Sequence, residues 1–331
     1  LHSFPTRRSS DLEIPKAMEY YQRALRHSLR QCGEHDLMTA KYYHGIGTVC
    51  HNQGGYTKAL EYLTKALTIY EEEFGSAHPY VATTYSSIGS VYDSMGEYAK
   101  ALEYNKKALS IREKVLSPDD MELGLSYNNT GLVYSSMGDY AKALEFFTKA
   151  LSIFEKILST DDPEIATSYN NIGFVYYRQG DNAKALEYHT KALSIYENDF
   201  GSEHPKVAMS YNNIGLVYSS MGDYAKALEF LTKALAIYEN VYGSNHPNVA
   251  TSYNNIGSVY DSQDDYAKAL KYYTKALNIR LKVLGKKHPD VARSYFFIGC
   301  VYENQGDYQK ALDYYNKSLV ILEKALGAEH P

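Results

Sequence analysis

The chain has 331 residues, with 34 Lys or Arg against 39 Asp or Glu, so its formal net charge is −5. This balance gives no broad basic surface for the phosphates of a nucleic acid. No stretch approaches the roughly 18 consecutive apolar residues of a membrane-spanning helix. We therefore expect neither a nucleic-acid partner nor a membrane span.

The three cysteines, Cys32, Cys50 and Cys300, are odd in number and form no CxxC pair. They predict neither a disulfide framework nor a thiolate metal site, and they favour a reducing, cytoplasmic setting. Residues 1–13 are rich in Arg and Ser and are expected to be a disordered or extraneous tail. The chain starts without Met and stops within a recurring motif, which suggests a piece of a larger protein.

Seven glycines recur at one spacing of 42 residues and predict an array of repeats. A partial repeat, the second helix of a preceding unit, is expected at residues 14–36. The glycines are Gly47, Gly89, Gly131, Gly173, Gly215, Gly257 and Gly299. The seven full repeats then span 37–78, 79–120, 121–162, 163–204, 205–246, 247–288 and 289–330, within an array over 37–330.

Each repeat is predicted to hold two helices, as the unit 163–204 illustrates. Ile165, Tyr169, Ile172 and Tyr176 recur at steps of four, three and four, which places them on one face of a first helix. Gly173 lies in the middle of that helix, where it costs roughly 1 kcal/mol relative to alanine, so a second helix must pack closely there.

The second helix of this unit follows Gly180, a residue suited to the left-handed end of the first helix. Asp181 is expected to cap it, and apolar residues again recur at helical spacing. One such hairpin cannot bury both apolar faces, but stacked hairpins share a continuous core. The predicted fold class is therefore an all-α solenoid.

One column at the joint between repeats holds His or Asp, usually followed by proline. We interpret these residues as helix caps, because each lies on a separate loop and they cannot converge on one metal ion. No metal site is expected. The column comprises His78, Asp120, Asp162, His204, His246, His288 and His330.

No catalytic residue set is recognised. Gly45 and Gly47 lack the third glycine of a dinucleotide loop, and no GKS/GKT, HExxH or GxSxG motif occurs. The paired acids at 119–120 and 161–162 lie in loops between repeats, without a basic or nucleophilic partner in their units. We expect a protein that is not an enzyme and needs no cofactor.

The repeated pattern resembles the tetratricopeptide repeat (TPR). The matching positions are Tyr169, Ile172, Gly173, Tyr176, Gly222, Tyr224, Ala227 and Ala234. The 42-residue length and joints such as residues 201–208 are similar to kinesin light chain repeats. The resemblance implies a right-handed solenoid whose first helices line a concave groove.

Four successive repeats carry an asparagine pair on the face opposite the buried one. Carboxamides donate and accept hydrogen bonds, as does the main chain of a bound peptide. The resemblance implies that the second member of each pair clamps that main chain. A solvated face copied by repeat duplication is the alternative. The pairs are Asn128 and Asn129, Asn170 and Asn171, Asn212 and Asn213, and Asn254 and Asn255.

The rest of the expected groove is polar and nearly neutral. Lys41, Arg178 and Arg293 are balanced by acidic residues at 93, 261 and 303. The predicted apolar pockets lie near Leu132, Phe174, Tyr177 and Leu216. Two departures from the repeat are Asp264 in place of a turn glycine and the Phe296–Phe297 pair in place of asparagines, and they break the pattern at that turn and in the last stretch of the groove.

The sequence thus predicts a cytoplasmic, cytoskeleton-associated scaffold or adaptor that binds peptide segments. In a kinesin-light-chain-like adaptor the partners would be a kinesin heavy chain or cargo, although no heptads precede Lys16. Two alternatives stay open. One is an interaction or regulatory region of a larger multidomain enzyme or signalling protein; the other is a self-assembling spacer with no peptide ligand.

Overall fold

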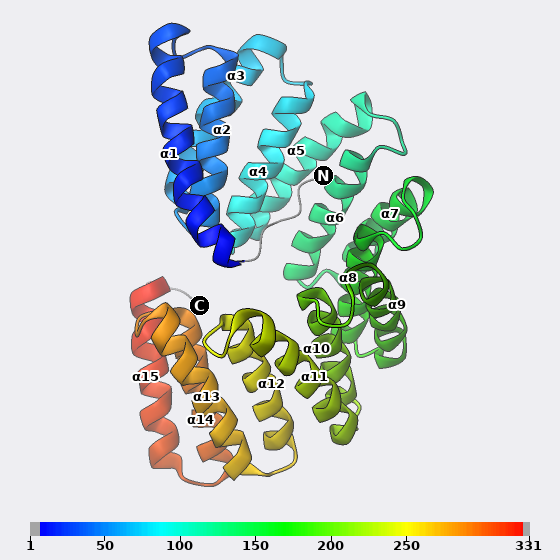
Figure 1. Cartoon of the computed structure of the whole chain (residues 1–331), viewed down its shortest axis with the longest axis vertical. Helices are drawn as coiled ribbons and strands as arrows, with labels where there is room; N and C mark the ends of the chain where they lie inside the picture. The colour runs from blue at the N-terminus through cyan, green and yellow to red at the C-terminus, as the bar shows by residue number, and fades with distance from the viewer. Residues whose placement is uncertain (1–6, 327–331) are drawn as a thin grey trace. The chain divides into compact units, whose positions relative to one another are not determined.

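The structure is a computed structural model that describes the backbone of residues 7–326 and the side chains of residues 16–324. This part of the chain is all-α, as predicted, with fifteen helices and no strand (Figure 1). The helices are α1 (Arg7–Gln31), α2 (Leu37–Asn52), α3 (Tyr56–Phe74), α4 (Pro79–Ser94), α5 (Tyr98–Val115), α6 (Met121–Ser136), α7 (Tyr140–Ile157), α8 (Pro163–Arg178), α9 (Asn182–Phe200), α10 (Pro205–Ser220), α11 (Tyr224–Tyr242), α12 (Pro247–Ser262), α13 (Tyr266–Leu284), α14 (Pro289–Asn304) and α15 (Tyr308–Leu326).

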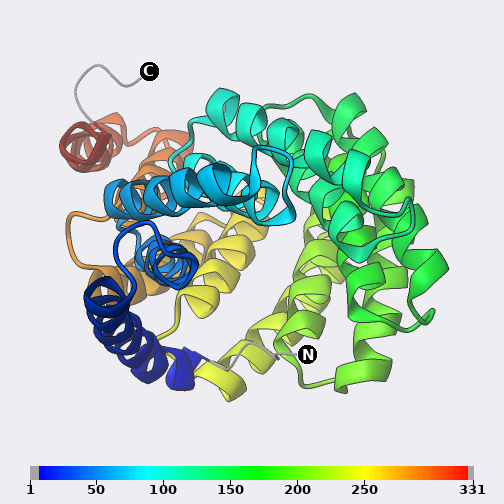
Figure 2. The same cartoon turned by 90° about the horizontal axis from the view of Figure 1, so that it is seen from above.

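The helices pair into antiparallel hairpins, each made of an even-numbered helix, here called A, and the odd-numbered helix that follows, called B (Figures 1 and 2). The chain forms two compact units. The first ends at Thr160 and contains α1 to α7; the second begins at Asp161 and contains α8 to α15. Within each unit, an A helix also packs on the preceding B helix.

The expectation for the N-terminal tail changes in one respect. Helix α1 begins at Arg7, so residues 7–13 of the predicted tail are helical. Residues 7–13 contain neither Gly nor Pro, but Pro15 lies inside this helix, and the residue types here give no physical reason for the helix to extend past it. Residues 1–6 of that tail lie outside the described residues.

The glycine in the middle of each A helix marks the place where the two helices of a hairpin meet. In α8, a Cβ atom added to Gly173 would lie 2.9 Å from the ring of His189 in α9. The corresponding residue in α11 is Leu231, whose Cγ would lie 2.8 Å from a Cβ on Gly215. The predicted crowding reason for these glycines is therefore confirmed.

The His and Asp column at the joints forms helix caps, as predicted. In α4, α10, α12 and α14 the cap is a histidine whose Nδ1 accepts a hydrogen bond from the backbone N–H two residues later, at 3.1–3.2 Å. Asp120 and Asp162 accept the same bond through Oδ1. His330 lies outside the described residues.

The turn between helices A and B requires a left-handed residue, which is a glycine in six hairpins. Gly222 and Gly306, for example, have φ angles of 79° and 78°. Asp264 takes this position between α12 and α13 with φ 59°, and among the described residues it is the non-glycine with positive φ. The sharp turn is therefore kept, with the backbone of an L-residue in a strained region.

Replacing Asp264 with glycine should stabilise the second unit by about 1 kcal/mol, because glycine has no Cβ to oppose the left-handed conformation. The gain is reduced by the loss of the hydrogen bond that the Tyr266 hydroxyl donates to Asp264 Oδ1 at 2.8 Å. Urea unfolding measures the change. The matched control, Gly306→Asp, should destabilise by a similar amount, and a D264G protein no more stable than wild type would contradict the strain argument.

A second stability effect comes from His189, which is 2% exposed and whose Nδ1 lies 2.8 Å from Asn170 Oδ1. Burial lowers the pKa of this imidazole to about 4. As pH falls below about 6.5, the unfolded chain therefore takes up the proton first. Stability is full above that pH and declines until pH about 4, by about 3 kcal/mol for this residue.

The variant His189→Leu, which copies Leu231 of the next hairpin, should remove this part of the acid sensitivity. The measurement compares urea midpoints of the two proteins at about pH 7.5 and about pH 4.5. Burial also lowers the pKa values of His44, His51 and His204, but these residues are present in both proteins. An equal loss of stability in both proteins would show that His189 is not the group responsible.

Candidate functional site

The predicted asparagines lie on A helices, which are also in contact with each other across neighbouring hairpins. Such contacts join α2 with α4 in the first unit, and α8 with α10 and α10 with α12 in the second. Like helices of successive hairpins approach each other on the inner side of a curved stack. The A helices therefore provide the inner face of each unit.

Hydrogen bonds between A helices cross this inner face in the second unit. Asn255 Nδ2 in α12 donates to Asn212 Oδ1 in α10 at 2.7 Å. Two helical turns further on, Asn304 Nδ2 in α14 donates to Asp261 Oδ1 in α12 at 3.3 Å. Each bond joins residues 43 positions apart, and we call these bonds inter-repeat rungs.

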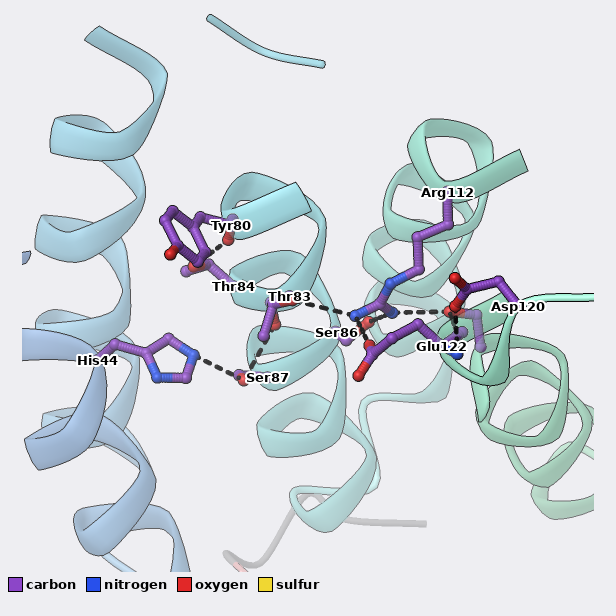
Figure 3. Close-up of polar contacts among 10 residues, drawn as sticks. His44, Tyr80, Thr83, Thr84, Ser86, Ser87, Arg112, Asp120 and Glu122 are labelled. Carbon is purple, nitrogen blue, oxygen red and sulfur yellow. Dashed lines mark hydrogen bonds and ion pairs between the residues drawn. The ribbon is translucent and has the colours of Figure 1, made fainter. Parts of the chain in front are cut away.

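The first unit has rungs at the same two levels, made by different residues. His44 Nε2 in α2 lies 3.1 Å from Ser87 Oγ in α4. Figure 3 draws this contact as a dashed line between the two helices. His51 Nε2 lies 2.9 Å from Ser94 Oγ. The asparagine column is thus part of a polar seam between repeats, a role that the sequence pattern did not reveal.

Asn170 is placed differently from the other asparagines, because it is only 5% exposed. Its Oδ1 faces His189 Nδ1, and its Nδ2 donates to Ser210 Oγ of α10 at 3.3 Å. Asn170 was expected to face a ligand, but its amide is held between three helices. The reason is His189, a polar residue where the neighbouring hairpin has Leu231, and a buried imidazole needs a hydrogen-bond partner.

The remaining predicted residues are half-buried or exposed. Phe174 and Leu132 are 42% and 40% exposed, and the Arg178 guanidinium lies 5.7 Å from the centre of the Phe174 ring. Asn128, Asn129 and Leu132 belong to the first unit and the others to the second. The half-buried residues are Asn128, Asn129, Asn171, Tyr177, Asn212, Asn213, Leu216, Asn254 and Asn255.

The structure also reveals a buried arginine that sequence reasoning missed. Arg112 of α5 is 5% exposed and reaches between α4 and α6 (Figure 3). Its Nη1 donates to Ser86 Oγ at 2.8 Å and to Ser126 Oγ at 2.7 Å. Its Nη2 donates to Thr83 Oγ1 at 3.1 Å and to Glu122 Oε2 at 2.9 Å.

Burial lowers the pKa of Arg112, while the nearby carboxylates of Glu122 and Asp120 act in the opposite direction. The sequence feature that could have revealed this arginine is a cation at a repeat position where most repeats have an aromatic residue. The column reads Tyr70, Arg112, Phe154, Tyr196, Tyr238, Arg280 and Leu322.

Among the described residues, no group of three or more His, Cys, Asp or Glu side chains is arranged to hold a metal ion. In the same part of the chain, none of the helices is both long and apolar enough to cross a bilayer. The chemistry that the inner faces offer is hydrogen bonding by amides and hydroxyls, together with contact to Leu132, Phe174 and Leu216.

Comparison with solved structures finds related solenoids. BtubC (BKLC) from P. vanneervenii is 24% identical, with a TM-score of 0.54, over 76% of this chain and 94% of that one. A second structure contains TPR-like repeats of Podosopora anserina that are nearly identical to one another and are described as those of a kinesin light chain. It is 22% identical to this chain with a TM-score of 0.54, over 60% of this chain and 94% of that one.

A third structure is the Rap conjugation gene regulator of plasmid pLS20 in complex with the Phr* peptide. It is 19% identical with a TM-score of 0.64, over 90% of this chain and 79% of that one. At these identities the likeness concerns the fold. A search of curated proteins finds no match.

The sequence profile of the tetratricopeptide repeat matches most of the chain. The matched ranges are 13–72, 38–114, 80–156, 164–240, 212–282 and 263–324. Together with the stacked hairpins, the glycine crossings and the caps, this match shows that the chain belongs to the tetratricopeptide repeat family.

Proposed function

We propose that this protein is a non-catalytic scaffold that binds extended peptide segments of partner proteins on the inner face of its A helices. The family is generally one of interaction scaffolds, and a solved relative of the same fold is in complex with a peptide. The observation that carries the proposal is the half-buried amide column beside exposed apolar side chains.

The inter-repeat rung between Asn212 and Asn255 is compatible with ligand binding. This bond uses one hydrogen of the Asn255 amide and one oxygen, Oδ1 of Asn212. Each primary amide carries two N–H donors and one oxygen with two lone pairs. A peptide main chain could therefore pair with the remaining groups while the rung holds the amides in place.

In the second unit, the proposed ligand-binding residues are Asn171, Asn213 and Asn255, with Phe174 and Leu216 in contact with apolar side chains of the peptide. Their neighbours Asn212, Asn254, Tyr177 and Arg178 would border the ligand. The first unit offers a separate surface of the same kind at Asn128, Asn129 and Leu132. Asn170 is left out, because its amide is occupied by His189 and Ser210.

The likeness to kinesin-light-chain-type repeats supports a cytoplasmic adaptor that links a kinesin heavy chain or a cargo protein. The second candidate is a regulatory region within a larger multidomain protein. It is favoured by structures such as a signal transduction ATPase with a tetratricopeptide repeat sensor. The match covers 44% of that chain, so the repeats there are one part of a larger protein. The sequence on either side of the repeats would distinguish the two.

Replacing Asn171 and Asn213 together by alanine should weaken peptide binding at least tenfold, since each loses a hydrogen bond to the ligand main chain. Peptides are first selected from a displayed random library, and their affinities are then measured by fluorescence anisotropy. The control is Asn278→Ala, on the exposed surface of α13. Unchanged affinities, or a melting temperature that falls in parallel with affinity, would contradict direct recognition by these asparagines.

For the selected peptides, affinity should change less than about threefold between about 50 and about 300 mM salt. The reason is that the cations Lys41, Arg178 and Arg293 of the two inner faces are matched by acidic residues at 93, 261 and 303. The same anisotropy titration at a series of sodium chloride concentrations provides the measurement. A steep loss of affinity would mean that charge, rather than amides and apolar contact, dominates recognition.

A further inference from the structure

A cavity of about 570 Å³ lies between α1 and the first turns of α2 in the first unit. It is separate from the asparagine column, because none of the described asparagines lines it. Pockets of this size can hold a small ligand or a few side chains of a peptide. The lining residues on which the inference depends are Tyr20, Arg23, His27 and Ser28 of α1 and Met38 of α2.

The cavity exists because two repeat positions that are aromatic in the next hairpin are not aromatic here. In that hairpin, Tyr70 and Tyr80 occupy the space between α3 and α4, with their ring centroids 5.3 Å apart. The residues 42 positions earlier are Ser28 and Met38. Ser28 is buried and its Oγ lies 2.8 Å from Thr39 Oγ1, so a small side chain held against α2 replaces a ring. The cavity therefore follows from the residue types at this joint.

His27 makes this face of α1 different from a face that receives an A helix of the array. The same position is isoleucine in all seven later B helices and is buried in five of them, whereas His27 is exposed. An A helix packed here as in the other hairpins would bury an imidazole, which needs a polar partner. The face therefore suits a partner that brings polar groups. The isoleucines are Ile69, Ile111, Ile153, Ile195, Ile237, Ile279 and Ile321.

The cavity combines an apolar wall with positive charge. Tyr20 and Met38 are 65% and 45% exposed, and Arg23 and His27 line the same cavity. None of the described residues that line it is acidic. Residues 16–31 of α1 carry four Lys or Arg against one Glu, which makes this surface attractive to an acidic partner.

The guanidinium of Arg23 lacks the partner that its position has in later repeats. In five of them, a lysine at this position binds a glutamate four residues earlier, as Lys65 binds Glu61 at 3.1 Å. Glu19 lies four residues before Arg23, yet the two form no ion pair among the described side chains. The acidic residues at 34 and 36 do not line the cavity, and the one at 36 caps α2. Arg23 is thus left for the carboxylate of a binding partner.

We propose that the cavity between α1 and α2 binds an acidic peptide segment of a partner protein. An apolar side chain of the segment contacts Tyr20 and Met38. A neighbouring carboxylate pairs with Arg23, whose guanidinium can bind both carboxylate oxygens. His27 donates an N–H to the same segment, which a neutral or a protonated imidazole can do. This surface does not use the asparagines, so it stands or fails separately from the peptide groove proposed above.

Three pentapeptides, each with capped ends, test the proposal on the full chain. Acetyl-Glu-Glu-Leu-Glu-Glu-amide has both features, the version with four Gln has no charge, and the version with Gly in place of Leu has no apolar side chain. Titrations follow the methionine methyl resonances by NMR. The first peptide should shift the Met38 signal saturably and leave unchanged the signal of Met221, which is 52% exposed in the second unit.

The two altered peptides should bind at least about tenfold more weakly, because each lacks one of the two contacts. The proposal is wrong if no peptide moves the Met38 signal, or if the uncharged peptide moves it as readily as the first. A Met38 signal that changes with protein concentration alone would place a second copy of the chain in the cavity, which would also contradict the proposal.

Arg23→Gln removes the arginine that lines the cavity and should weaken binding of the acidic peptide at least about fivefold. The matched control is Arg30→Gln, which changes the net charge equally at an exposed position of the same helix outside the cavity lining. At about 150 mM salt, R30Q should bind within about twofold of wild type, because distant charges are screened. Equal losses in both variants would mean that overall charge attracts the peptide, and would overturn the site.

Tyr20→Ser tests the apolar wall. The side chain is 65% exposed, so its removal should leave the chain folded while binding of the acidic peptide falls at least about fivefold. The matched control is Tyr308→Ser, at a 72% exposed tyrosine of α15, which should leave binding unchanged. Binding by Y20S as tight as that of wild type would contradict the proposal.

Discussion

The close approach of helix A to helix B at a glycine is the constraint on which each hairpin depends. Without a Cβ, the A helix lets one side chain of helix B lie against its backbone, within about 3 Å of where that Cβ would be. The facing position is buried in six of the seven hairpins and half-buried at Tyr315, yet its residue type differs from hairpin to hairpin. The pairs are Gly47 with Leu63, Gly89 with Asn105, Gly131 with Phe147, Gly173 with His189, Gly215 with Leu231, Gly257 with Tyr273 and Gly299 with Tyr315.

The chemistry of that enclosed residue determines what its neighbours do. Where it is Leu231, no polar partner is needed. His189 instead draws the amide of Asn170 away from the inner face, and Asn105 leaves a buried oxygen without a hydrogen-bond partner among the described residues. Nearly identical repeats thus differ in the polarity of their surfaces because of one position in their interior.

Much of the fold could be predicted from the sequence, because it depends on local rules. Glycine spacing, helical periodicity and capping chemistry are all written within single repeats, and they located the hairpins, the caps and the left-handed turns. The start of α1 was missed, since Ser10, Asp11 and Pro15 are residue types that favour a helix start close to residue 14 rather than at Arg7. Asp264 kept the turn because helix packing on either side outweighs the strain of one residue.

The inner faces were harder to predict, because their geometry depends on how neighbouring repeats are offset. Periodicity places Asn212 and Asn255 opposite the core, but only the offset of 43 residues brings them together. The sequence also did not reveal that Arg112 and Arg280 have different partners. Glu122 forms an ion pair with Arg112, whereas Asp290, which is one methylene shorter, forms one with Arg293. Such contacts between repeats decide which polar groups are left for a ligand.

The inter-repeat rungs have a mechanical consequence. They tie the inner edges of adjoining hairpins, as at His44 with Ser87 and at Asn212 with Asn255. Widening a unit would stretch the rungs, so its curvature resists opening. A binding partner thus meets a surface whose pitch is already set, and little of the association energy is spent on reshaping the receptor.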